Sequence, residues 1–139
     1  MPLSADQSAF LWPVRVYYED TDAQGVVYYA NYFRYMERAR TEWLRALGVE
    51  QDVLMQEQRR VFVVVDTQAE FLKPARFNDQ LTVSARLLNR ARASFDLEQI
   101  ISRTNGELLV RGRTRAAYLN ADTMKPVRLP ADLFEESKI

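Results

Sequence analysis

The 139-residue chain contains no histidine and no cysteine. Without cysteine it can form no disulfide, offers no thiolate to a metal ion and has no thiolate nucleophile. Without histidine it lacks the side chain that most often acts as a general base near neutral pH. Carboxylates are therefore the leading candidates for chemistry, and their spacing is not that of a calcium-binding loop. We predict no metal site and no cofactor.

A surplus of charge and long apolar runs are also missing. Nineteen basic residues balance nineteen acidic ones, so there is no basic excess to attract nucleic acid. No apolar run approaches the roughly 18 residues that a membrane-spanning helix needs, which argues against an integral membrane segment. Residues 1–6 lack the basic and apolar parts of a signal peptide. Together with the lack of cysteine, this predicts a cytoplasmic protein.

Glycine and proline are scarce, with four and five residues, and 47% of the chain is hydrophobic. This composition argues against disordered and collagen-like classes and is typical of a folded globular protein. The length suits a single domain, which we predict to span residues 1–139.

The apolar pattern predicts one strand followed by one long helix. Residues 14–20 alternate between apolar and polar, as in a half-buried strand. A helix is predicted from Asn31, a suitable N-cap, to Leu47, with Gly48 as the residue that ends it. Its apolar residues recur at helical spacing and form one stripe that needs a surface to cover: Tyr32, Tyr35, Met36, Ala39, Trp43 and Leu47.

After a second, short helix at about residues 50–58, the apolar period changes from helical to two. Four strands with short connections are predicted at about residues 61–71, 81–87, 94–101 and 108–119, followed by a loop at 122–130. Asn105-Gly106 predicts a hairpin with a type I′ turn between the last two strands. Short connections favour antiparallel pairing. The predicted fold is therefore α+β, with an antiparallel sheet wrapped around one central helix.

Three carboxylates, Glu19, Asp20 and Asp22, cluster where the first predicted strand ends, before the long helix. Gly25 allows a close approach of the backbone, and the helix N-terminus that follows favours negative charge and would polarise a carbonyl. A carboxylate in this setting is suited to act as a general base or a nucleophile. The alternative is that the three residues are solvated turn formers, because aspartate is common in turns.

Four segments in order support the catalytic interpretation. The stretch Asp20–Tyr32, DTDAQGVVYYANY, is followed by the helical stretch Met36–Arg45, by FLKPARFND at Phe71–Asp79 and by Ser94-Phe95. They resemble hotdog-fold acyl-CoA thioesterases of the 4-hydroxybenzoyl-CoA thioesterase type, nearest the Tol-Pal-associated acyl-CoA thioesterase branch. The resemblance covers roughly residues 13–130. It implies acyl-CoA thioester hydrolase activity and a five-stranded antiparallel sheet around a long helix, in agreement with the periodicity.

The resemblance implies roles for the residues of the acidic loop. Asp22 would be the nucleophile or general base of thioester hydrolysis, and Asp20 would shape the loop. Tyr29 stands where the Tol-Pal branch usually has a histidine and where 4-hydroxybenzoyl-CoA thioesterases have a tyrosine. It would orient the thioester or donate a hydrogen bond, or else serve as a packing aromatic. Val27 and Tyr32 would also line the substrate site, where a backbone N–H near the helix start polarises the carbonyl.

A second group of residues would hold the rest of the substrate. Arg90 and Arg92 precede Ser94-Phe95 and resemble the basic segment that contacts CoA phosphates in relatives, a contact for which guanidinium groups are well suited. The alternative for both is a solvated turn. Glu37 lies where the helix would reach the acyl pocket. A row on the last strand is interpreted instead as an exposed charged face offset by acidic residues on a neighbouring strand: Arg111, Arg113 and Arg115.

The resemblance also implies a homodimer in which two sheets pair edge to edge, or a homotetramer of two such dimers. The expected substrate is a short-to-medium aliphatic acyl-CoA, with an aryl-CoA as the alternative that Tyr29 favours. Whether CoA or an acyl carrier protein carries the acyl group stays open. The alternative function is a non-catalytic dimeric module that binds acyl thioesters or acts as a scaffold. Hotdog-fold hydratases and dehydratases match poorly, because those use a histidine.

Overall fold

A computed structural model describes residues 9–135 of the chain. Residues 1–8 and 136–139 lie outside the described part. The prediction about a signal peptide concerns residues 1–6 and therefore falls outside it. One antiparallel sheet of five strands has the order β1-β3-β4-β5-β2, which confirms the predicted fold. The elements are β1 (Phe10–Arg15), the 3₁₀ turn η1 (Tyr18–Asp20), α2 (Ala30–Ala46), α3 (Gln51–Gln58), β2 (Arg60–Phe71), β3 (Gln80–Arg90), β4 (Ser94–Arg103) and β5 (Leu108–Asn120).

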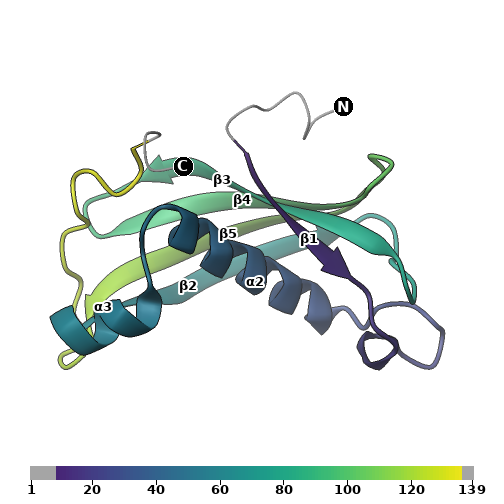
Figure 1. The fold of residues 1–139 in the computed structure, drawn as a ribbon, viewed down its shortest axis with the longest axis horizontal. Coiled ribbons are helices and arrows are strands. Elements are labelled where there is room, and N and C mark those ends of the chain that lie inside the picture. The colour runs from purple at the N-terminus through teal and green to yellow at the C-terminus, as the bar shows by residue number, and fades with distance from the viewer. Residues whose placement is uncertain (1–8, 136–139) are drawn as a thin grey trace.

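The long helix α2 lies across one face of the sheet, and the strands curve around it (Figure 1). Its apolar stripe is buried because the residues recur on the side that faces the strands. Gly112 of β5 allows a close approach of helix and sheet, since a Cβ at this position would lie 2.5 Å from Sδ of Met36. All six predicted stripe residues are at most 3% exposed: Tyr32, Tyr35, Met36, Ala39, Trp43 and Leu47.

The C-terminal end of α2 matches the prediction. Gly48 has a φ of +92°, a conformation that glycine adopts without strain. Its N–H donates to the carbonyl of Arg45 at 3.0 Å, and the N–H of Val49 donates to the carbonyl of Leu44 at 2.9 Å. These two hydrogen bonds are those of a Schellman motif, with the usual apolar contact between Val49 and Leu44 in the same core cluster.

The start of α2 differs from the prediction. The helix begins at Ala30 with Tyr29 as its N-cap, so Asn31 is not the capping residue. Asn31 is buried, and its Nδ2 donates to the backbone carbonyl of Asp20 at 2.9 Å. The side chain therefore ties the acidic loop to the helix instead of capping the helix.

The first strand is also displaced from the predicted residues 14–20. β1 ends at Arg15, and it includes Pro13, which an edge strand tolerates because one side of its backbone needs no partner. The η1 turn replaces the predicted end of the strand. It forms because Oδ2 of Asp20 accepts a hydrogen bond from the backbone N–H of Tyr17 at 2.9 Å.

The predicted hairpin joins β4 to β5, but its turn is not type I′. Asn105 does not have the positive φ that such a turn requires, whereas Gly106 has a φ of +95°. The N–H of Gly106 donates to the carbonyl of Arg103 at 2.8 Å, and the N–H of Arg103 donates to the carbonyl of Glu107 at 2.9 Å. This is a type I turn followed by a left-handed glycine, the usual three-residue hairpin loop.

The two outer strands of the sheet are β1 and β2. The twelve-residue strand β2 pairs with β5 on one side and has no neighbouring strand on the other within the described residues. A register shift between Val64 and Asp66 makes a bulge in this strand. Val64, Val65 and Phe71 are 42%, 56% and 48% exposed, so β2 presents a long and partly apolar edge.

Candidate active site

Asp22 lies in a tight hairpin between η1 and α2. Its N–H donates to the carbonyl of Val26 at 2.9 Å, and the N–H of Gly25 donates to the carbonyl of Asp22 at 2.9 Å. Gly25 has a φ of +80°, so a side chain there would be strained. Oδ1 of Asp22 accepts a hydrogen bond from the N–H of Gln24 at 2.9 Å, and Oδ2 has no partner within the described residues. One carboxylate oxygen is therefore fixed by the turn and the other is open to a ligand.

Asp20 accepts four hydrogen bonds. Its Oδ2 accepts from the N–H of Tyr17 at 2.9 Å and from the hydroxyl of Tyr35 at 2.8 Å. Its carbonyl accepts from the N–H of Tyr28 and from Nδ2 of Asn31, both at 2.9 Å. Burial and the hydrogen bond to Asp20 raise the pKa of Tyr35, so the phenol stays protonated and keeps donating. These contacts agree with the loop-shaping role expected of Asp20.

Helix α2 begins directly after the Asp22 hairpin. It has no acidic residue in its first turn, so its own side chains do not offset the positive end of its dipole. The backbone N–H groups of Tyr29 and Ala30 make no hydrogen bond within the described residues, whereas that of Val27 donates to the carbonyl of Ala75 at 2.9 Å. Val27 itself is 4% exposed. Among the described residues, the amides of Tyr29 and Ala30 at the helix start are therefore free to donate to a ligand.

Aromatic rings flank this helix start. Tyr29 is 57% exposed, and its ring centroid lies 5.0 Å from that of Tyr28 and 6.1 Å from that of Phe71. Tyr32 is buried, with its centroid 5.7 Å from that of Phe71. Its hydroxyl accepts a hydrogen bond from the N–H of Ala75 at 3.0 Å, and burial raises its pKa. Within the described residues the hydroxyl of Tyr29 makes no hydrogen bond, whereas that of Tyr32 is bound to the segment that joins β2 to β3.

Glu37 lies two turns further along the exposed side of α2. It lines a hollow of about 270 Å³ between α2 and β2, together with Phe33, Arg40 and Val64. Nη1 of Arg40 donates to Oε1 of Gln99 at 2.9 Å, and burial lowers the pKa of Arg40. The residues that line this hollow are partly apolar and partly charged, and they do not include Asp22.

Arg90 and Arg92 lie at the opposite end of the sheet from Asp22. The Asp22 hairpin is attached near the start of β3, through a bridge between Val26 and Arg76, and the two arginines follow the end of β3. The ten steps along β3 correspond to about 33 Å. Figure 1 shows the loop before α2 and the β3–β4 turn at the two ends of the molecule. A single protomer therefore does not bring these arginines to Asp22.

The two arginines have different surroundings. Nη2 of Arg90 donates to the carbonyl of Pro130 at 3.2 Å, and its guanidinium lies 5.4 Å from the centroid of Phe134. Arg92 is exposed, and its side chain makes no hydrogen bond or ion pair within residues 9–135. The C-terminal segment, which includes part of the predicted loop at 122–130, packs on the core here: Leu129 and Leu133 are buried, and Phe134 stacks on Trp43 with centroids 5.5 Å apart. Arg90 is thus partly engaged by the C-terminal segment, and Arg92 is open to a ligand.

The row of arginines on β5 is an exposed charged face, as interpreted from the sequence. Arg111 pairs with Glu70 of β2 at 3.3 Å. Arg113 and Arg115 pair with Asp96 of β4 at 3.1 and 2.8 Å. The hydrogen bond from Arg115, reinforced by Arg113, lowers the pKa of Asp96 to about 2.

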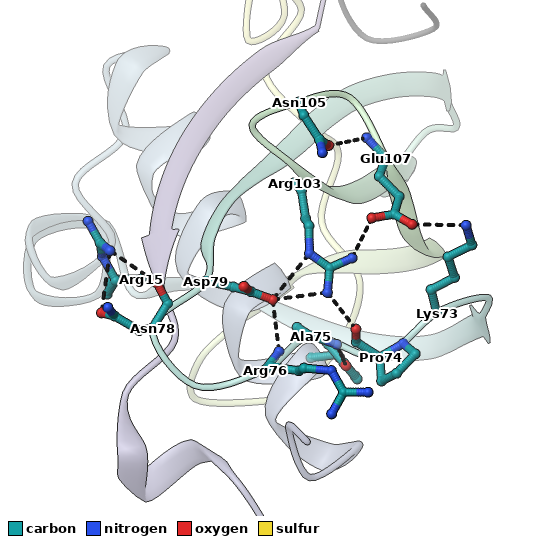
Figure 2. Close-up of polar contacts among 11 residues, drawn as sticks. Arg15, Lys73, Pro74, Ala75, Arg76, Asn78, Asp79, Arg103, Asn105 and Glu107 are labelled. Atoms are coloured by element: carbon teal, nitrogen blue, oxygen red, sulfur yellow. Dashed lines mark hydrogen bonds and ion pairs between the residues drawn. The ribbon is translucent and has the colours of Figure 1, made fainter. Parts of the chain in front are cut away.

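Sequence reasoning missed a polar network on the segment that joins β2 to β3 (Figure 2). Asp79 of this segment binds Arg103 at the end of β4, and Arg103 also binds Glu107, which binds Lys73. Asp79 and Arg103 lie 24 residues apart, and no local pattern links them. The only available signal was that Phe71–Asp79 belongs to the segments that resemble the thioesterase family.

Residues 9–135 contain no cluster of three or more histidine, cysteine, aspartate or glutamate side chains that could hold a metal ion. In the same part of the chain, no helix is long and apolar enough to cross a membrane.

Known proteins resemble the chain over most of its length. The family model described as the thioesterase-like superfamily matches residues 16–136. The acyl-CoA thioesterase YbgC of Haemophilus influenzae is 40% identical over 126 residues, which cover 91% of this chain and 92% of that protein. The acyl-CoA thioester hydrolase YbgC of Escherichia coli O157:H7 is 41% identical over 129 residues, which cover 93% and 96%.

A solved structure agrees with these matches at the level of the fold. The 4-hydroxybenzoyl CoA thioesterase of Pseudomonas sp. strain CBS-3 superposes with a TM-score of 0.84 at 24% identity, over 92% of this chain and 98% of that one. The family resemblance of the sequence is confirmed. The chain belongs to the thioesterase-like superfamily and has the hotdog fold.

Proposed function

We propose that the chain hydrolyses the thioester bond of acyl-CoA to a free acid and CoA, with Asp22 as the catalytic carboxylate. The observation that carries the proposal is the local geometry of the loop. Asp22 has an open Oδ2 in a hairpin that directly precedes the free N–H groups of Tyr29 and Ala30. The relatives named acyl-CoA thioester hydrolases, at about 40% identity over nearly the whole chain, support the activity.

The free amides would hold the thioester carbonyl oxygen as negative charge develops on it. Backbone N–H donors at a helix N-terminus are suited to this, because they are fixed before the reaction and the helix dipole adds to them. Asp22 then acts in one of two ways. It attacks the carbonyl carbon to give an acyl anhydride that water cleaves, or it takes a proton from the attacking water. In both routes the C–S bond breaks and the CoA thiolate leaves and takes up a proton.

The acyl group is proposed to be a short-to-medium aliphatic chain, with an aryl group as the alternative. The exposed ring of Tyr29, next to Phe71, offers an apolar wall to either. We propose CoA as the carrier and the cytoplasm as the location.

We further propose that two copies of the chain pair through β2. A strand of twelve residues with one free edge and exposed Val64, Val65 and Phe71 would invite aggregation unless it were covered. A second copy of the same strand is a matching cover, since a two-fold axis places identical edges antiparallel. Such a dimer continues one sheet through both protomers. Pairing of two dimers into a tetramer is the further alternative.

This pairing would bring the separated parts of the site together. The Asp22 hairpin lies near the Phe71 end of β2, because Tyr29 contacts Phe71. The β3–β4 turn lies near the other end, because Ser94 is paired with Ala117, which is paired with Val63 of β2. Antiparallel pairing sets the Phe71 end of β2 in one protomer beside the Arg60 end of β2 in its partner. The dimer would thus place Asp22 of one protomer on the same side as the partner's β3–β4 turn, the basic turn that contains Arg90 and Arg92. Their guanidinium groups are suited to bind CoA phosphates.

The oligomer is tested by a lysine at the centre of the free edge. Val65→Lys should give a monomer in light scattering and reduce hydrolysis, because a charge at the paired edge opposes pairing. Leu11→Lys is the matched control, since Leu11 is 48% exposed on the other outer strand. It should leave both the mass and the activity unchanged. A Val65→Lys protein with the wild-type mass would contradict pairing through β2.

The activity is tested by thiol release from acyl-CoAs with short, medium and aryl acyl groups. Asp22→Asn should lower kcat by several orders of magnitude, because the amide neither attacks nor accepts the proton. Asp52→Asn is the matched control: Asp52 also accepts one backbone hydrogen bond, at 2.8 Å, but lies in α3. It should retain wild-type activity. An active Asp22→Asn protein would reject the role of Asp22. A wild-type protein that binds the acyl-CoAs but cleaves none of them would favour the non-catalytic acyl-thioester-binding module.

A further inference from the structure

We propose that Arg103 and Asp79 position the Asp22 hairpin for catalysis, acting through the segment that joins β2 to β3. The inference rests on the proposed catalytic role of Asp22. Neither residue touches the hairpin directly, so both are positioning residues. The path runs from the end of β4, through residues 74–79, to the hairpin and the start of α2.

Arg103 holds the connecting segment at two points. Its Nη2 donates to the carbonyl of Pro74 at 2.9 Å and to Oδ2 of Asp79 at 3.0 Å, and its Nε donates to the same Oδ2 at 3.2 Å. Nη1 donates to Oε1 of Glu107 at 2.6 Å, which fixes the guanidinium from the other side. Figure 2 shows Arg103 between Asp79, Pro74 and Glu107. The planar guanidinium reaches both ends of the segment at once, which a lysine amine does less well.

Asp79 closes the segment on itself. Its Oδ2 also accepts the backbone N–H of Arg76 at 2.8 Å, and its own N–H donates to the carbonyl of Arg76 at 3.1 Å. Its carbonyl accepts the N–H of Val16, just after β1, at 2.9 Å. The side chains of Arg103 and Asp79 are only 22% and 25% exposed. The segment is therefore held in one shape by a charge pair that is largely shielded from water.

The far side of this segment holds the catalytic loop. Ala75 is fully buried, and its carbonyl accepts the N–H of Val27 at 2.9 Å. Its N–H donates to the hydroxyl of Tyr32 at 3.0 Å. Val27 closes the Asp22 hairpin opposite Thr21, and Tyr32 lies in the first turn of α2. Ala75 thus joins the Asp22 hairpin to the first turn of α2, which carries the free amides.

A positioning role predicts a specific kinetic signature. Displacing the carboxylate from the carbonyl by about 1 Å lowers the rate of the chemical step by up to about a hundredfold, with little effect on the binding of CoA, whose proposed contacts lie elsewhere. Arg103→Met should therefore lower kcat at least about tenfold per folded molecule and leave KM nearly unchanged. Arg103→Lys keeps the charge and should recover part of the loss. Asp79→Asn should lower kcat in the same way, and it serves if Arg103→Met fails to fold.

The matched control is Arg45→Met. Arg45 also pairs with two carboxylates, Glu42 and Glu50, but it lies at the opposite end of α2 from the Asp22 hairpin. Its kcat should equal that of the wild type. Thermal unfolding of each variant gives the folded fraction at the assay temperature. The positioning role is overturned if Arg103→Met and Asp79→Asn lose activity only in proportion to the folded fraction. It is also overturned if they raise KM and leave kcat unchanged.

Amide hydrogen exchange provides a readout that does not depend on activity. Arg103→Met should speed exchange at the N–H of Val27, whose acceptor is Ala75 of the connecting segment, and at the N–H of Asp22, whose acceptor is Val26 of the hairpin. It should leave exchange at the N–H of Val49, at the far end of α2, unchanged. Unchanged exchange at Val27 and Asp22 would overturn the inference even if kcat fell. An active Asp22→Asn protein with faster exchange in Arg103→Met would separate the two claims: the loop is positioned, but Asp22 is not its catalytic group.

Discussion

Removal of one hydroxyl tests how firmly the acidic loop is attached to the central helix. In Tyr35→Phe, Oδ2 of Asp20 loses a hydrogen bond of 2.8 Å from a side chain that is 1% exposed, and keeps the bond from the N–H of Tyr17. A hydrogen bond to a charged group contributes about 1.5 to 3 kcal/mol. With an unfolding entropy of about 2.1 cal/mol/K per residue, a loss of about 2 kcal/mol lowers Tm by about 7 °C.

Thermal unfolding followed by circular dichroism measures this change, and a double-mutant cycle assigns it to the pair. In an Asp20→Asn background, Tyr35→Phe should cost only about 1 kcal/mol, because the acceptor is neutral. Tyr118→Phe is the control: Tyr118 is 4% exposed, and its hydroxyl makes no hydrogen bond within residues 9–135. It should shift stability by less than about 0.5 kcal/mol. A Tyr35→Phe protein as stable as this control would refute the attachment of the loop through Asp20.

Substitutions at three further positions test an ion pair, the helix–sheet contact and the aromatic wall of the site. The hydrogen bond from Arg115 lowers the pKa of Asp96 from 3.8 to about 2, so Asp96 adds stability above pH 4 that is lost as the pH falls toward 2. Asp96→Asn should cost about 1 to 2 kcal/mol at pH 7 and little near pH 2, measured by urea unfolding at both. Gly112→Ala places a Cβ 2.5 Å from Sδ of Met36 and should cost about 1 to 3 kcal/mol in the same assay. Tyr29→Phe should keep most of the thiol-release activity, whereas Tyr29→Ala should not, because the ring packs on Phe71 and the proposed donors are backbone amides.

The regular elements could be predicted because their signal is periodic and repeated. The stripe on α2 contains six residues at helical spacing, and all six are buried. Errors arose where a single side chain decides the backbone. The carboxylate of Asp20 turns the chain into η1, although residues 14–20 alternate like a strand. Asn31 is a residue type that often caps helices, yet its side-chain amide donates to the carbonyl of Asp20 in the loop.

The site could be predicted only in part, because its residues come from distant segments. Asp22, Val27 and Tyr29 lie within eight consecutive residues of the sequence, in the hairpin and at the start of the helix that follows it. The positioning network links residues that are 24 positions apart, and no pattern in one sequence reveals such a contact. Arg90 and Arg92 were predicted for the same site as Asp22, but they lie at the other end of the protomer, so only a second copy of the chain would bring them near.

A mixture of two impaired proteins tests most directly whether Asp22 of one protomer works with the basic turn of its partner. Asp22→Asn removes the carboxylate, and Arg92→Glu reverses the charge proposed to contact CoA. After subunit exchange, half of the dimers contain one protomer of each kind, and each of these has one intact site, so about a quarter of wild-type thiol release should return. Activity no greater than that of the two proteins measured separately, or an Arg92→Glu protein as active as wild type, would contradict the shared site.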